Sequence, residues 1–145
     1  LCFGVPIMKI LIRNLDSVVI YAQDDLILDN EAHGNNWHDA NFNTTNATLA
    51  DATLPHLWSG AVWSYIDESW LVVDTVRHDE LVANEKAEQA ALVRQSRNGK
   101  LKDSDWTQLV DSKADTLVWA TYRQSLRDIT NQSDFPFNVN FPAQP

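Results

Sequence analysis

The chain has 145 residues, enough for one domain or two small modules, and a chain of this length buries about 70% of its unfolded surface on folding. Hydrophobic residues make up 44% and charged residues 21%, which is typical of a globular protein and excludes collagen-like, disordered and disulfide-scaffold classes. The 20 acidic and 11 basic residues give a net charge of −9, which disfavours nucleic-acid binding, and the short apolar runs predict no membrane span.

The charges are distributed unevenly along the chain. Residues 1–76 hold two basic and ten acidic residues, whereas residues 77–145 hold nine basic and ten acidic residues. We therefore expect two modules and an α+β fold, with an acidic, antiparallel β-rich module over 1–76 and a two-helix module over 77–145. Residues 1–7 are interpreted as an upstream extension or a non-native remnant, because Met8-Lys9-Ile10 resembles a natural start. A signal peptide is not expected, since no basic region precedes the apolar residues and the apolar stretch is too short.

The first module begins with a predicted strand, turn and strand. Residues 10–12 are apolar, residues 14–17 favour a turn, and residues 17–21 are rich in β-branched side chains. The polar stretch 29–46 has few apolar residues and is expected to form a loop.

A second hairpin is predicted over 62–66 and 70–73, with residues 67–69 as the turn. Alternation places Trp63 and Tyr65 on one face of this hairpin. Both faces carry bulky side chains, so we expect each to be covered by another part of the chain or by a partner.

The second module begins with a predicted helix over 79–97. Its composition favours a helix, and Asn98-Gly99 is expected to end it because glycine adopts the left-handed conformation without steric strain. The apolar face is narrow, which indicates either light packing or packing against another chain.

A second helix is predicted after Ser112, with Ser112 as its cap and Asp115 in a capping-box relation. Prolines 136 and 142 favour extended backbone for the phenylalanines that precede them, so the tail cannot be helical. We expect this tail to dock on its own helical module. Apolar side chains recur with helical spacing at Val118, Tyr122, Leu126 and Ile129, with Trp119 beside them.

Motifs that carry chemistry are missing from the sequence. It has no glycine-rich phosphate loop, no HExxH, no CxxC and no GxSxG. His33 and His38 lie near acidic residues, but their spacing matches no standard metal site, and Cys2 is the single cysteine. We therefore predict no catalytic residue, no metal and no cofactor.

The C-terminal third contains a specific pattern. It includes Ser-Asp-Trp-Thr-Gln-Leu at 104–109, Trp-Ala-Thr-Tyr-Arg-Gln-Ser-Leu-Arg-Asp-Ile at 119–129, and two Phe-Pro pairs before the last three residues. Over about residues 94–145 this pattern resembles phage tail assembly chaperone-like proteins, including tail fibre assembly proteins. Phe141 stands where that family usually has tryptophan.

The resemblance implies a chaperone that binds the trimeric tail fibre protein of its phage, at the distal receptor-binding region, and assists folding and trimerisation without ATP. It implies action in the host cytoplasm, with about three copies per fibre trimer. The alternative that it also allows is a structural virion component retained on the tail fibre or baseplate.

Two sets of residues follow from these considerations. The motif residues expected to shape the helical module are Ser104, Asp105, Trp119, Tyr122, Leu126, Pro136 and Pro142. The aromatic and arginine side chains that are candidates for contact with the partner are Trp63, Tyr65, Trp70, Trp106, Arg123, Arg127, Phe135 and Phe141.

Overall fold

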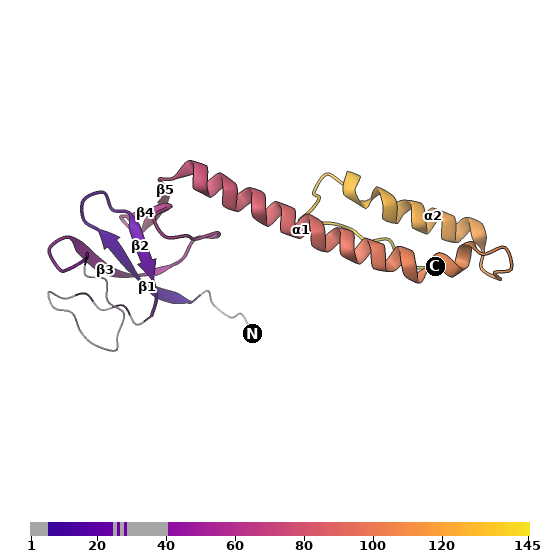
Figure 1. Cartoon of the computed structure of the whole chain (residues 1–145), viewed down its shortest axis with the longest axis horizontal. Coiled ribbons are helices and arrows are strands. Elements are labelled where there is room, and N and C mark those ends of the chain that lie inside the picture. Colours follow the sequence, from indigo (N-terminus) through magenta and orange to yellow (C-terminus); the bar gives the residue numbers. More distant parts are fainter. Residues whose placement is uncertain (1–5, 25, 27, 29–40) are drawn as a thin grey trace. The chain divides into compact units, whose positions relative to one another are not determined.

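The computed structural model describes residues 6–24, 26, 28 and 41–145 (Figure 1). The chain divides into two compact units, residues 1–82 and 83–145. Strands form the first and helices the second, which confirms the α+β fold. The elements are β1 (Ile7–Arg13), β2 (Val19–Ala22), β3 (Ala47–Thr53), β4 (Trp63–Ile66), β5 (Ser69–Val72), α1 (Thr75–Asp103), the 3-10 turn η1 (Asp105–Gln108), α2 (Thr116–Arg127) and the 3-10 turn η2 (Asp128–Asn131).

Strand β1 lies at the centre of a three-stranded antiparallel sheet in the order β2-β1-β3. The predicted strand–turn–strand is confirmed as β1 and β2, with Leu11 opposite Tyr21. Strand β3 pairs with β1 along its whole length, from Ile7 opposite Thr53 to Arg13 opposite Ala47. No strand was predicted over the residues of β3. Ile7 was placed in the expected extension, but it pairs with Thr53 and is part of the sheet.

The second predicted hairpin is confirmed as β4 and β5. Its turn has two residues rather than three, because Ser69 already pairs with Ile66. Both turn residues, Asp67 and Glu68, have positive φ, 49° and 59°, as a two-residue turn compatible with strand twist requires.

Two apolar clusters hold the first unit together, one on each side of β1. Ile10 packs with residues of β2 and β3 and with the aromatic rings of the β4–β5 hairpin. Leu11 points to the opposite side and packs with Leu26 and Ala47. Gly60 approaches β2 closely, since a Cβ there would lie 2.6 Å from the Ile20 carbonyl oxygen.

Helix α1 is longer than predicted. The prediction of a helix over 79–97 ending at Asn98-Gly99 is wrong, because α1 begins at Thr75 and runs through Gly99. It begins early because Asp74 Oδ1 accepts the Arg77 N–H at 3.0 Å. It ends where the Ser104 hydroxyl donates to the carbonyl oxygens of the last turn, at 2.9 and 3.0 Å.

Helix α2 is confirmed, with a different cap. Asp115, not Ser112, caps it, and its Oδ1 accepts the N–H groups of Leu117 and Val118 at 3.1 and 3.2 Å. The Ser112 hydroxyl instead accepts the Ala114 N–H within the preceding loop. None of the helices in the described residues is long and apolar enough to cross a membrane.

Candidate partner-binding surface

Arg123 of α2 contacts the end of α1 at Leu101, Ser104 and Asp105, a junction that we call the corner of the helical unit. Its Nη1 donates to the Leu101 carbonyl at 2.7 Å and to the Ser104 hydroxyl at 2.8 Å. Its Nη2 pairs with Asp105 Oδ1 at 2.7 Å. The Arg123 side chain is 9% exposed and the Asp105 side chain 65%. This arginine therefore fixes α2 against the end of α1 and is occupied by its own chain.

An apolar core lies beside this corner. Trp119, Tyr122 and Leu126 of α2 are buried and pack with Leu101 of α1 and Phe141 of the tail. These were among the residues expected to shape the module. One expectation differs, because Val118, which the helical spacing placed on the apolar face, is 46% exposed. Trp106, a candidate for contact with the partner, is 53% exposed, and the 3-10 turn η1 buries Thr107.

The C-terminal tail folds back on the helices of its own unit (Figure 1). The Arg94 guanidinium lies 5.4 Å from the centre of the Phe135 ring, and the Lys100 ammonium lies 5.7 Å from that of Phe141. The Gln132 side chain makes two hydrogen bonds to the Asn140 backbone, at 2.9 and 2.8 Å. Both phenylalanines are thus engaged internally, which agrees with the expected self-docking.

The connection between α1 and α2 carries a group of exposed apolar side chains. We call residues 103–118 the hairpin tip; it lies at the right-hand end of the helical unit in Figure 1. The rings of Trp106 and Trp119 lie 5.8 Å apart, so the two ends of this short segment are held close together. The exposed apolar residues of the tip are Trp106, Leu109, Val110, Leu117 and Val118.

The exposure of these side chains is extensive. Val110 is fully exposed, Leu117 is 78% exposed and Leu109 is 61% exposed. Single exposed apolar residues are common on protein surfaces, but a group of five within one short segment is a feature of interaction sites.

Acidic residues surround the apolar side chains of the tip. Residues 103–118 contain four aspartates, at 103, 105, 111 and 115, and one lysine, Lys113. All five of these charged residues are exposed. The helical unit, residues 83–145, has eight basic and eight acidic residues, so the acidity is specific to the tip.

The aromatic candidates of the β unit pack mainly against one another. The ring of Trp70 lies 4.8 Å from Tyr65 and 6.5 Å from Trp63. Trp63 also contacts His78, with 5.2 Å between ring centres, and the Trp70 Nε1 donates to the Thr53 carbonyl at 3.0 Å. These three aromatic side chains are half-buried, so each retains some accessible surface.

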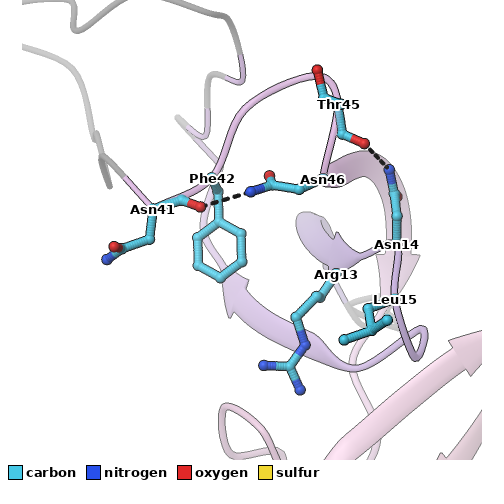
Figure 2. A pocket seen from close by; sticks show the side chains of 7 residues that line it. All are labelled: Arg13, Asn14, Leu15, Asn41, Phe42, Thr45 and Asn46. Atoms are coloured by element: carbon cyan, nitrogen blue, oxygen red, sulfur yellow. Dashed lines mark hydrogen bonds between the residues drawn. The ribbon is translucent and has the colours of Figure 1, made fainter.

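A pocket of about 560 Å³ opens beside the turn after β1 (Figure 2). Asn46 Nδ2 donates to the Asn41 carbonyl at 2.8 Å and Asn14 Nδ2 donates to the Thr45 carbonyl at 3.2 Å, so these amides hold the loops in place. Arg13, which also lines the pocket, pairs with Asp16 at 2.6 Å. The described lining residues include no carboxylate, no histidine and no cysteine, and the Thr45 hydroxyl has no base among them to activate it.

The remaining residues singled out from the sequence fall in two groups. Arg127 is exposed on the last turn of α2. His33, His38 and Cys2 lie outside the described residues, and within the described ranges no group of three or more metal-ligating side chains occurs. Sequence analysis missed Leu109, Val110 and Leu117; the signal was present, because they are apolar residues without periodic partners, flanked by aspartates.

No curated protein and no solved structure matches the chain. A family model does match, that of the phage tail assembly chaperone protein, over residues 90–145. This range includes the hairpin tip, α2, the Arg123 corner and the docked tail. The resemblance seen over residues 94–145 is thereby confirmed: residues 90–145 are similar to the phage tail assembly chaperone family.

Proposed function

We propose that the protein is a tail fibre assembly chaperone that binds the fibre protein of its own phage. The family match over residues 90–145 is the observation that supports it. In this proposal the chaperone acts in the host cytoplasm, covers the distal receptor-binding region of the fibre and assists trimerisation, with about three copies per trimer.

The physical need for such a protein follows from the nature of fibres. Long β-rich chains fold slowly and expose strand edges before they trimerise, which leads to aggregation. A small acidic protein that covers this surface would keep the chain soluble. Binding alone is sufficient for this activity, so the proposal includes no catalytic step, no ATP and no cofactor.

Co-expression with the neighbouring fibre gene tests the proposal. We expect the fibre to be insoluble alone and to elute as a soluble complex with this protein, and the mass of the complex to give the number of copies. ATP independence is tested by refolding the fibre with purified protein. The yield of soluble fibre should be the same with ATP present and after ATP has been removed with apyrase. A fibre that folds equally well alone and forms no complex would refute the proposal.

The same experiment separates a chaperone from a structural subunit. Mass spectrometry of purified virions would detect a retained subunit at a fixed ratio to the fibre. A chaperone that dissociates from the fibre before the virion is complete would be present in the soluble complex and absent from virions.

A further inference from the structure

We propose that the hairpin tip, residues 103–118, is where the tail protein binds, and that the bound segment is amphipathic, with apolar side chains flanked by lysine or arginine. The inference rests on the proposed function and adds to it the surface and the chemistry of the partner.

The apolar part of the argument comes from exposure. Val110 and Leu117 are almost entirely in water, and no packing within the unit requires apolar side chains at these positions. Removing such side chains from water is favourable by about 25 cal/mol per Å² of apolar surface, so a partner that covers them gains affinity. Trp106 adds a half-exposed aromatic ring, a residue type that dominates many interfaces.

The chemistry of the partner follows from charge. The tip has four aspartates and one lysine; Asp105 is paired with Arg123, which leaves three aspartates against that lysine. The remainder of residues 83–145 carries more basic than acidic residues. A segment with basic residues beside its apolar ones would complement the tip and be oriented by it, while an acidic segment would be repelled. Two copies of the chain joined tip to tip would bring two negative surfaces together, which disfavours a second copy as the occupant.

The tail of the chain itself is also excluded as the occupant. Phe135 and Phe141 contact α1 at Arg94 and Lys100, and Phe141 packs in the core of the unit. The described structure therefore leaves the tip uncovered while the aromatic tail is already docked.

A binding assay with defined peptides tests the inference. The probes are a fluorescently labelled amphipathic peptide of leucine and lysine and its leucine–glutamate counterpart, titrated with the full chain and followed by anisotropy. We expect the lysine peptide to bind and the glutamate peptide to bind at least about tenfold more weakly, a difference of about 1.4 kcal/mol. Raising the salt concentration from about 0.1 M to about 1 M shortens the screening length from about 10 Å to about 3 Å. The affinity for the lysine peptide should therefore fall.

Two pairs of variants locate the binding. The double variant Leu109→Ser/Val110→Ser should bind the lysine peptide about tenfold more weakly. Leu92→Ser, at an exposed position of α1, should leave the affinity unchanged. Asp111→Lys should weaken it, whereas Glu88→Lys, which makes the same charge change on exposed α1, should have little effect. All of these positions are exposed, so circular dichroism and melting temperature should stay as in the wild type.

The outcomes distinguish this inference from the proposed function. If the Leu109/Val110 double variant binds the peptide as the wild type does, or keeps a co-expressed fibre equally soluble, the inference is wrong although the chaperone function stands. Equal binding of both peptides would refute the charge argument. A dimer in sedimentation that the double variant abolishes would assign the tip to a second copy instead. If the wild type fails to solubilise the fibre, the proposed function fails whatever the peptides do.

Discussion

The Nη2 atom of Arg123 donates to Asp105 Oδ1 at 2.7 Å and joins α2 to the residues that directly follow α1. The same guanidinium donates to the Leu101 carbonyl and the Ser104 hydroxyl, which are much less accessible to water than Asp105. A motif residue of the C-terminal pattern thus joins α2 to the end of α1, next to the exposed tip.

Replacing Arg123 should destabilise the helical unit more than replacing Asp105. Arg123→Met keeps much of the side-chain volume but removes three hydrogen bonds, so we expect a loss of about 2–3 kcal/mol of unfolding free energy. Asp105→Asn removes the charge of the largely exposed member of the ion pair and should lower the unfolding free energy by less than about 1 kcal/mol. Urea denaturation followed by far-UV circular dichroism measures both, and equal losses would contradict the assignment of the buried bonds as the main contribution.

Asp115 should contribute more to α2 than Ser112 does. Asp115→Ala leaves the N–H groups of Leu117 and Val118 without their acceptor and should destabilise the unit by about 1 kcal/mol. Asp115→Asn keeps an acceptor at the cap and should have a smaller effect. Ser112→Ala is the comparison, measured by the same denaturation assay; a larger loss there would restore the cap predicted from sequence.

Docking of the tail can be tested at Phe141. Its ring packs with the Trp119 cluster and lies over Lys100, so Phe141→Ala should reduce the unfolding free energy by about 1–3 kcal/mol. Phe141→Trp places at this position the residue usual in the family and should retain most of the stability. Thermal melts of the full chain measure both, and an unchanged melting temperature for Phe141→Ala would show that the tail contributes no packing.

Sequence patterns predicted the elements in which apolar residues alternate or recur. Both hairpins and α2 have this regularity, and their residues are found where the patterns put them. Strand β3 was missed because three alanines and one aspartate among the seven residues of Ala47–Thr53 weaken the strand signal, and only its pairing with β1 makes it a strand. Tertiary pairing of this kind cannot be seen in a local window.

The candidate surface was predicted less well for a related reason. Aromatic and arginine residues were chosen by type, yet Arg123 and Phe141 turn out to serve the interior of the unit. Leu109 and Val110 were overlooked because apolar residues are normally read as core. Exposure depends on where the chain turns, and the turn closed by the Ser112 N–H donating to the Leu109 carbonyl at 3.1 Å has no periodic apolar pattern that would reveal it.

The Arg13–Asp16 pair predicts a specific pH dependence in the β unit. Hydrogen bonds from Arg13 lower the pKa of the Asp16 carboxyl below its ordinary value. A carboxyl with a lowered folded-state pKa stabilises the fold above its unfolded pKa, about 3.9, and this contribution is lost as the pH falls through the lower folded value.

Both side chains are about 40% exposed, so the contribution at neutral pH should be below about 1 kcal/mol. Asp16→Asn retains an acceptor for the Val18 N–H and isolates the effect of the charge. NMR titration of the Asp16 carboxyl should show the lowered pKa in the wild type and an ordinary one in Arg13→Ala. An unchanged pKa in that variant would show that the pair does not persist in solution.

Replacing glycine by alanine should have opposite effects on stability at Gly99 and at Gly60. Gly99 lies inside α1 with nothing within 4 Å of an added Cβ and without a positive φ, so Gly99→Ala should stabilise the helix by about 0.5–1 kcal/mol. At Gly60 the added Cβ would lie 2.6 Å from the Ile20 carbonyl oxygen, and Gly60→Ala should destabilise the β unit because the backbone has to move. Thermal melts followed by circular dichroism compare the two variants. A loss of stability in Gly99→Ala would indicate that the helix ends at Asn98-Gly99 after all, since alanine is strained in the left-handed conformation that such an ending needs.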